Sequence, residues 1–496
     1  VNNYAQISFN VGPTLLSWLE HHAPETYGTI LDADRLSRER FSGHGSAIAQ
    51  PYNHMIMPLA TRRDKVTQVR WGIEDFKRRF RREPEGMWLP ETAVDTETLD
   101  VLAEHGLKFT ILAPRQAART RKGDSPHWTD TAGERIDPTT AYNLQLPSGR
   151  NIAVFFYDGP IAKAVAFEGI LSSGESFANR LVGAFDNARP WPQIVNVAVD
   201  GETFGHHHRF GEMALAYALQ YIEQNQLARI TNYGEYLERH PPTHEVQVVE
   251  RSSWSCPHGV ERWRSDCGCN TGQNSAWNQE WRTPLREALD WLRDTVMTEF
   301  EAESRKLVND PWLTRDRYIE VILDRSPNAL ATFIDRQAGH SLDDAERIRL
   351  LKLLELQRHA MLMFTSCGWF FDELSRIETV QVMQYAGRVA QLARELFGNG
   401  TETAFLERLA QAHSNLDEQG NGWNIFERFV KPASADLAAV AAHFAVSSVF
   451  EHFGHAFDMF CYQVRVEDSR SDFPPSPVDK AAPLSTLRQQ ETLNPR

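Results

Sequence analysis

Two acidic residues flank a glycine directly after an apolar run. The run is Ile194 to Val199, and Asp200 and Glu202 follow it. A strand this apolar is expected to be buried on both faces. Asp200 then lies at the end of the strand, where partial desolvation raises the pKa of a carboxyl group. His206 to His208 come next, and we expect one or two of these histidines, such as His207, to line the same site. The alternative is a helix-capping aspartate beside a solvated glutamate.

A second carboxylate, Glu91, follows Trp88 and Pro90 in the run Gly86-Met87-Trp88-Leu89-Pro90-Glu91. The tryptophan and the proline form a rigid apolar collar, in which Glu91 could act as a nucleophile. The alternative is a glutamate at a helix N-terminus, stabilised by the helix dipole. Glu91 and Asp200 on separate strand ends would form the pair of carboxylates that glycosidases use, one as nucleophile and one as general acid and base. Neither step needs a cofactor.

A third group of reactive side chains lies in the segment 252–269, with Cys256, His258, Cys267 and Cys269. These are zinc-compatible ligands, although one residue between the last two cysteines is a tighter spacing than usual. We favour a compact loop of buried thiols, with zinc binding as the alternative and a redox pair as a third possibility. Trp254, Arg262 and Trp263 could also border a sugar-binding cleft.

The first half of the chain repeats one theme: an apolar run, a polar residue and then a helical pattern. The strand-like runs end near residues 10, 54, 91, 113, 158, 200 and 232. Strands that alternate with helices pair in parallel, and about seven such units favour a (β/α)7-type barrel of the triosephosphate-isomerase kind. Asn10, Asn53, His54 and Asp158 join the two carboxylates at the strand ends. An open doubly wound sheet is the competing architecture, but no glycine-rich phosphate loop favours it.

The second half of the chain is helical by its pattern. Apolar residues recur at three-and-four spacing over 283–302, 345–364, 379–397 and 435–457. We expect a barrel over 1–245, a Cys/Trp-rich loop over 246–280, a helical domain over 281–465 and a loose tail over 466–496.

Composition narrows the class of protein. The 496 residues carry 52 basic and 66 acidic side chains, a net charge of −14, which excludes an electrostatic grip on nucleic acid or on an anionic membrane. No window approaches the ~18 apolar residues of a membrane span. Three of the five cysteines crowd together, whereas Cys367 and Cys461 stand alone, and we expect a reducing, cytoplasmic compartment.

These motifs together resemble glycoside hydrolase family 57, in a subgroup labelled by a domain of unknown function. Residues 45–58, with Gln50-Pro51-Tyr52-Asn53-His54, resemble the second conserved region of the family. Residues 88–91 resemble the third, which carries the nucleophile, and 200–205 the fourth, which carries the acid/base. Residues 363–369 are the candidate for the fifth, with Trp369 as a sugar-stacking residue. The first region, a His-x-His-Gln-Pro-like stretch, has no match, and we expect the barrel to lack its first strand through truncation.

The resemblance implies a seven-stranded β/α barrel plus a helical domain, and retaining action on α-linked oligo- or polysaccharides by hydrolysis or transfer, without a cofactor. It implies Glu91 as nucleophile and Asp200 as acid/base. The expected substrate-binding residues are His54, Trp88, Asp158, Glu202, His207, Trp254, Trp263 and Trp369. Two alternatives stay open: a glucan-binding protein without catalysis, and a metal-dependent carbohydrate deacetylase that uses Asp200 with two histidines. The oligomeric state is open.

Overall fold

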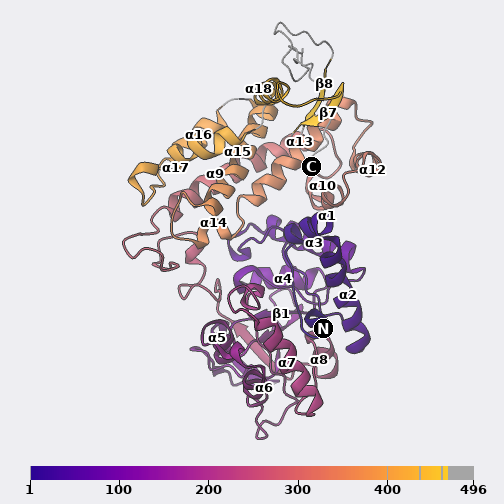
Figure 1. Ribbon diagram of the computed structural model, residues 1–496, viewed down its shortest axis with the longest axis vertical. Helices are drawn as coiled ribbons and strands as arrows, with labels where there is room; N and C mark the ends of the chain where they lie inside the picture. Colours follow the sequence, from indigo (N-terminus) through magenta and orange to yellow (C-terminus); the bar gives the residue numbers. More distant parts are fainter. Residues whose placement is uncertain (1, 124, 399, 435–436, 460–461, 467–496) are drawn as a thin grey trace. The chain divides into compact units, whose positions relative to one another are not determined.

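The computed structural model describes residues 2–123, 125–398, 400–434, 437–459 and 462–466 (Figure 1). The chain forms two compact units, the first comprising Val1–Cys269 with Phe364–Ser366 and the second comprising Asn270–Met363 with Cys367–Arg496. The loop expected over 246–280 is therefore divided between the units. Cys461 and the expected tail beyond residue 466 lie outside the described residues.

The first unit combines helices with short strands. Its helices are α1 (Pro13–His22), α2 (Pro24–Arg40), α3 (Arg62–Phe80), α4 (Thr96–Glu104), α5 (Gly159–Phe167), α6 (Gly174–Val182), α7 (Gly211–Gln224) and α8 (Tyr233–Arg239). Its strands are β1 (Phe109–Leu112), β2 (Ala117–Lys122), β3 (Thr129–Asp130), β4 (Ala141–Gln145), β5 (Asn151–Phe156) and β6 (His244–Val248). Local sequence sets several boundaries: α4, for example, begins where the Asp95 side chain accepts a hydrogen bond from the Thr98 N–H.

The strands form a mixed sheet in the order β1-β5-β4-β6-β2-β3. β1 pairs with β5 in parallel, and β4 with β6 in parallel, whereas β4–β5, β2–β6 and β2–β3 are antiparallel. The alternation of strands with helices predicts only the parallel pairs. The antiparallel strands are short and lie between β1 and α5 or after α8, where no helix intervenes to mark them.

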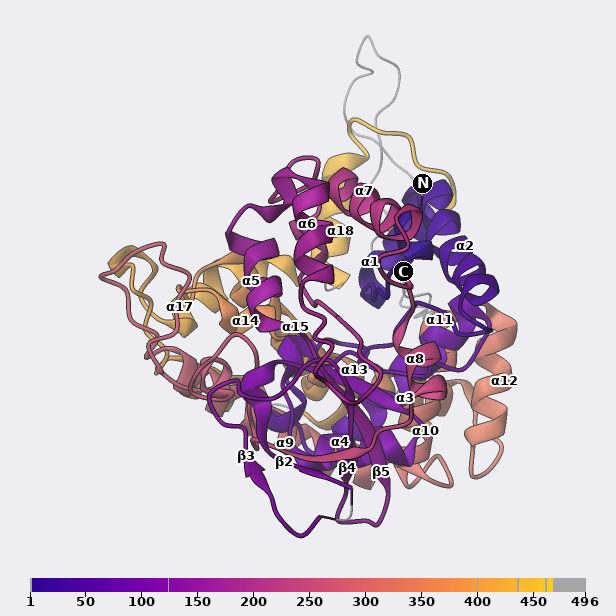
Figure 2. The same ribbon diagram turned by 90° about the horizontal axis from the view of Figure 1, so that it is seen from below.

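The parallel arrangement continues beyond β1 towards the start of the chain. Single parallel bridges join Phe9 to Ala47, Ala49 to Met87 and Gly86 to Phe109. Extended segments therefore lie side by side in chain order from Phe9 to β5, as the strands of a TIM-like barrel do. In Figure 2 the helices α5, α6, α7 and α2 follow one another in an arc on one side of the strands. The expected α/β class, a TIM-like fold with a helical domain after it, is confirmed.

The strands predicted to end near residues 10, 54 and 91 are represented by single bridges only. The segments 194–199 and 229–232 form no ladder, so these two predictions of regular strands are wrong. Side chains take the place of the ladder. The buried Asn196 donates from Nδ2 to the Phe156 carbonyl over 3.1 Å and accepts from the Tyr233 hydroxyl over 3.1 Å. Its own carbonyl accepts from the Asp158 N–H over 2.8 Å. These bonds fix the segment beside the end of β5.

The second unit is mainly helical. It contains α9 (Arg282–Ser304), α10 (Pro311–Arg317), α11 (Ile319–Leu323), α12 (Pro327–Gln337), α13 (Asp344–Leu362), α14 (Cys367–Phe370), α15 (Ile377–Phe397), α16 (Thr401–Leu409), α17 (Gly422–Ile425), α18 (Leu437–Ser447), β7 (Ala456–Met459) and β8 (Tyr462–Arg465). Three predicted helices match α9, α13 and α15. The fourth was predicted too long, because α18 ends at Ser447.

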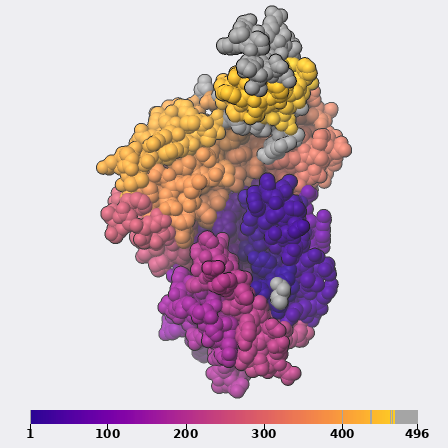
Figure 3. Space-filling view, viewed as in Figure 1, coloured from indigo at the N-terminus to yellow at the C-terminus, as the bar shows by residue number. Residues whose placement is uncertain are grey.

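An antiparallel hairpin, β7–β8, follows α18 and packs against it through Val440, Phe444, Met459 and Val464 (yellow in Figure 3). Among the described residues no single helix is long and apolar enough to cross a membrane. A bent pair, Gly422–Ala433 with Leu437–Ser447, passes the same test of length and composition.

Candidate active site

Glu91 lies in a tight turn that follows the extended segment 86–88. That segment is hydrogen-bonded on both sides, since the Met87 N–H donates to Phe109 and the Trp88 N–H donates to Ala49. Glu91 has a φ of 58° and Thr92 a φ of 49°. Left-handed backbone is unfavourable for residues with side chains, and most of all for a β-branched threonine. Such strain persists only where the surroundings impose it, and it gathers at functional sites.

The carboxylate of Glu91 is held by two neighbouring residues from a distant part of the chain. Trp254 Nε1 donates to Oε2 over 2.9 Å, and Ser255 Oγ donates to the same oxygen over 2.6 Å. The Trp254 N–H also donates to the Glu91 carbonyl over 3.0 Å. Backbone and side chain of Glu91 are therefore both fixed by the segment 254–255.

Gln116, which is fully buried, supports this turn from beneath. Its Oε1 accepts from Thr92 Oγ1 and from the Ala113 N–H, each over 2.8 Å. Its Nε2 donates to the Thr92 carbonyl over 2.8 Å and to Ser252 Oγ over 3.2 Å. One amide thus connects the turn that carries Glu91 to the segment that supplies the donors for Glu91.

His54 lies at the end of the neighbouring extended segment and is also left-handed, with a φ of 54°. The buried Asn53 is held by Gln68. The Asn53 N–H donates to Gln68 Oε1, and Gln68 Nε2 donates to Asn53 Oδ1, each over 2.7 Å. The His54 Nδ1 lies 2.8 Å from Ser366 Oγ, and the Ser366 N–H donates to the His54 carbonyl. Burial lowers the pKa of His54, which favours the neutral ring, and the negative charge of Glu91 opposes this shift only in part.

The proton affinity of Asp200 is altered by this cluster. The residue is exposed to solvent, yet protein atoms gather around its carboxyl group. This desolvation, followed by the negative charges of Glu91 and Glu202, raises its pKa to about 6, and His207 opposes the shift. Because Glu91 acts on both Asp200 and His54, the structure brings these three residues into one electrostatic cluster.

Aromatic rings surround the two carboxylates. The ring centroids of Trp88 and Trp254 are 5.1 Å apart at an interplanar angle of 68°, and Tyr157 lies edge-on to Trp254 at 6.1 Å. Burial raises the pKa of Tyr157 to about 12, and the charges of Glu134 and Asp200 add to the increase. Both tryptophans are half-buried.

The other expected binding residues differ in their surroundings. Glu202 and His207 are exposed and act on Asp200 through charge. Asp158 caps α5, because its Oδ1 accepts from the Ile161 N–H over 2.9 Å. Trp263 is 0% exposed and Trp369 is 1% exposed, so neither presents an open face to a sugar. Trp369 belongs to the second unit, with the Arg286 guanidinium 5.7 Å from its ring centroid.

Several residues of the cluster carry no clear sequence signal. Ser255 and Tyr157 are adjacent to residues that the sequence singles out, and Ser366 lies in the segment proposed as the fifth conserved region. In that segment it is Ser366, rather than Trp369, that the structure places beside His54. Gln116 has no signal, since a lone glutamine in a loop has no pattern to mark it.

Comparison with known proteins identifies the first unit. Residues 16–249 match the family model Glycosyl hydrolase family 57, and residues 277–473 match the model Domain of unknown function (DUF3536). Residues 16–249 belong to glycosyl hydrolase family 57. The expected resemblance is thereby confirmed, and the family 57 segment contains Glu91, Asp200 and His54.

Two curated proteins are similar to part of this chain. Alpha-amylase 1 of Dictyoglomus thermophilum is 25% identical over 141 residues, which cover 28% of this chain and 18% of that relative. The 4-alpha-glucanotransferase of Thermococcus litoralis is 22% identical over 274 residues, covering 52% of this chain and 37% of that relative. The chain thus spans well under half the length of these two curated relatives.

Among solved structures, an exo-type maltose-forming amylase from Pyrococcus sp. ST04 is similar in fold to this chain. Its TM-score is 0.64 at 16% identity, with 82% of this chain and 72% of that chain covered. At this identity the likeness supports the fold alone, and the chemistry must be argued from the residues of this chain.

Proposed function

We propose that this chain is a retaining glycosidase or glucanotransferase that acts on α-glucans. The observation that carries the proposal is the difference between its two carboxyl groups. Glu91 receives two hydrogen-bond donors on one oxygen, whereas desolvation and the charge of Glu91 raise the pKa of Asp200 to about 6. Two carboxyl groups in unlike environments form the usual acid and nucleophile of a glycosidase.

The roles follow from these environments. Trp254 and Ser255 both bond to Oε2 of Glu91, which leaves Oε1 to attack the anomeric carbon. As that C–O bond forms and the glycosidic bond breaks, Asp200 gives its proton to the leaving oxygen. Asp200 then takes a proton from water or from a sugar hydroxyl, whose oxygen displaces Glu91 and regenerates the enzyme. Water gives hydrolysis, and a sugar gives transfer.

The aromatic rings and the relatives support the class of substrate. Trp88 and Trp254 are half-buried and in contact with each other, and the Trp254 indole bonds to Glu91. Flat apolar faces suit sugar rings. The curated relatives are named as an α-amylase and a 4-α-glucanotransferase, which favours an α-linked glucan. Tyr157, His54, Glu202 and His207 are then placed to orient its hydroxyl groups.

The stereochemistry of the product tests the proposal directly. Maltoheptaose is incubated with the full chain, and the first reducing ends released are followed by proton NMR before they mutarotate. We expect the α-anomer, because two displacements at the anomeric carbon restore its configuration. Early release of the β-anomer would contradict a retaining mechanism and would make Glu91 a base rather than a nucleophile.

Substitution of each carboxyl group tests its role. We expect Glu91→Gln to abolish turnover and Asp200→Asn to lower kcat by about 10²–10⁴-fold on maltoheptaose, with the fold intact. The loss in Asp200→Asn should be smaller with 4-nitrophenyl α-maltoside, whose leaving group needs less protonation. Glu104→Gln and Asp32→Asn, which remove exposed carboxylates, are matched controls. Wild-type rates in both Glu91→Gln and Asp200→Asn would refute the assignment.

The same variants separate this proposal from a protein that only binds glucans. For such a protein, the wild type would show no turnover and Glu91→Gln would leave binding unchanged.

A metal-dependent deacetylase would need Asp200 within a group of metal ligands. Within the described part of the chain, the group of His, Cys, Asp and Glu side chains close enough together to hold an ion is Cys256, His258, Cys267 and Cys269. Asp200 is not part of that group.

A further inference from the structure

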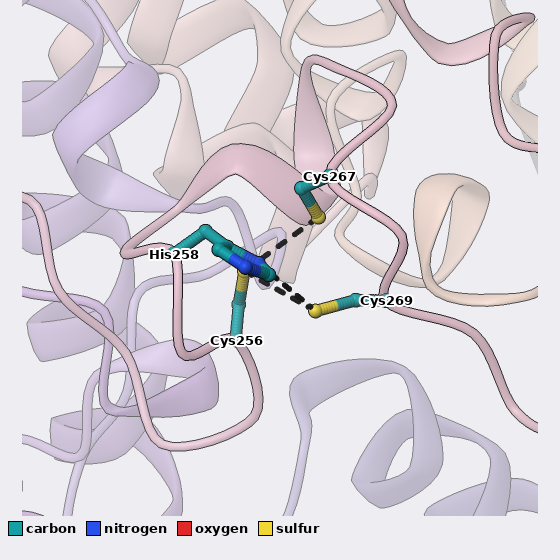
Figure 4. A group of neighbouring side chains, drawn as sticks. All are labelled: Cys256, His258, Cys267 and Cys269. Carbon is teal, nitrogen blue, oxygen red and sulfur yellow. Dashed lines mark hydrogen bonds between the residues drawn. The ribbon is translucent and has the colours of Figure 1, made fainter.

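The loop that follows β6 brings four metal-binding side chains together (Figure 4). One donor atom each from Cys256, His258, Cys267 and Cys269 lies within 4.8 Å of all the others. Cys256 is buried, Cys267 and Cys269 are partly buried, and His258 is exposed. The proposed glycosidase chemistry uses none of the four.

The distances between the donor atoms match those of a tetrahedral zinc site. Cys256 Sγ lies 3.7 Å from Cys269 Sγ and 3.9 Å from Cys267 Sγ, and Cys269 Sγ lies 3.6 Å from His258 Nδ1. Zinc bound at ~2.3 Å to sulfur and ~2.0–2.1 Å to nitrogen places two sulfurs about 3.8 Å apart, and a sulfur and a nitrogen about 3.6 Å apart. These three distances therefore fit such a site, and the other donor atoms lie within 4.8 Å of one another.

The backbone of the loop turns these side chains towards one point. Gly259 has a φ of 88°, and a Cβ there would lie 2.4 Å from the Arg251 carbonyl oxygen, so only glycine allows the close turn after His258. Gly268, with a φ of 78°, separates Cys267 from Cys269. Residues two positions apart point to the same face of an extended strand, so the one-residue spacing lets both thiols face one point, and both lie near Cys256 Sγ, at 3.9 and 3.7 Å.

We propose that Cys256, His258, Cys267 and Cys269 bind one structural Zn²⁺ ion. Three thiolates and one imidazole fill the four positions of a tetrahedron, which is the closed ligand set of a structural site. Binding replaces the three thiol protons, which are released to solvent. The sequence spacing alone favours a loop of thiols without a metal. We now prefer zinc binding, because all four donor atoms lie within 4.8 Å of one another.

The site lies next to the residues that orient Glu91, so a bound ion would also affect them. Cys256 follows Trp254 and Ser255, the two residues that hold Glu91. The Arg262 Nη1 donates to the Ser255 carbonyl over 3.1 Å. Arg262 lies in the sequence between the first two ligands and the last two. The loop that the ion would close therefore also supports the donors of Glu91. Zinc would tie residues 256–258 to residues 267–269 and so restrict the motion of the segment 254–255.

Metal content tests the proposal without reference to activity. The purified full chain is dialysed and analysed by inductively coupled plasma mass spectrometry, and we expect one zinc ion per chain. Cys267→Ser and Cys269→Ser should each fall below about a tenth of an ion. Cys367→Ser, which removes an exposed cysteine of the second unit, is the matched control and should keep one ion.

A cobalt exchange experiment on the wild-type chain covers the case in which the serine variants do not fold. Zinc is withdrawn with a chelator and Co²⁺ is added, and we expect the intense visible bands of tetrahedral cobalt with a sulfur charge-transfer band. Hydrogen exchange should be faster in the zinc-free chain over 252–269 and unchanged in α9. Absence of zinc together with failure to bind Co²⁺, or a disulfide mapped between two of these cysteines in the chain from a reducing host, would overturn the proposal.

Discussion

The indole Nε1 of Trp254 donates a 2.9 Å hydrogen bond to Oε2 of Glu91, across 163 residues of sequence. The partner that orients the proposed nucleophile is therefore an aromatic residue whose ring also packs against Trp88. Ser255 adds a second donor to the same oxygen. The direction of the carboxylate is thus set by the loop after β6 and not by the turn that bears it.

Removal of the indole donor should slow the reaction without removing the aromatic surface. We expect Trp254→Phe to lower kcat by about 10- to 100-fold, because hydrogen bonds to charged groups contribute ~1.5–3 kcal/mol. The KM for maltoheptaose should change little, since a ring remains. Steady-state kinetics measure both. Trp18→Phe, at a tryptophan that is 54% exposed, is the control, and equal effects in the two variants would contradict a specific role for Trp254.

The pH dependence of kcat/KM should respond to two neighbours of Asp200 with opposite signs. The proposed acid must be protonated, so activity should fall as pH rises through about 6. Glu202→Gln removes a negative charge that raises the pKa of Asp200, and should move this limb to lower pH. His207→Gln removes a positive charge that lowers it, and should move the limb to higher pH. Shifts in the same direction, or none, would contradict Asp200 as the titrating group.

The raised pKa of Asp200 also has a consequence for stability. The folded state binds the proton of Asp200 more tightly than the unfolded state, so between pH 3.8 and about 6 the contribution of Asp200 to stability decreases as pH rises. Asp200→Asn should therefore unfold at a higher temperature than the wild type at pH 8, and this difference should disappear below pH 4. Calorimetry at the two pH values measures the change, and a lower melting temperature at pH 8 would contradict it.

Gln116 should be important for stability even though it touches no substrate. Gln116→Leu leaves the Ala113 N–H, the Thr92 hydroxyl and carbonyl, and Ser252 Oγ without this partner. At ~1–3 kcal/mol for an unsatisfied buried group, we expect a loss of about 3 kcal/mol in the free energy of unfolding, measured in urea. Gln145→Leu, at an exposed glutamine of β4, should change it by under ~0.5 kcal/mol. If Gln116→Leu lowered the free energy of unfolding no more than Gln145→Leu does, the Gln116 amide would be dispensable for stability.

The sequence predicts the parts of this molecule that depend on local pattern. Periodicity locates α9, α13 and α15, and apolar runs that end in acids single out Glu91 and Asp200. Patterns do not reveal that Asn196 replaces a ladder by side-chain bonds, because only the tertiary partners Phe156 and Tyr233 make this possible. Residue type also cannot separate Trp254, whose indole bonds to Glu91, from Trp263, which is fully buried.

The long-range partners of the cluster have a consequence for synthesis of the protein on the ribosome. Ser366, the hydrogen-bond partner of His54, is synthesised 312 residues after it. At a translation rate of ~5–20 residues per second, this is a delay of roughly 15–60 s. During that interval the nascent chain can form β1 to β5 and yet lacks the residues that fix His54, and for part of it those that fix Glu91. Any catalytic competence would thus be acquired late in translation, after the surrounding sheet has formed.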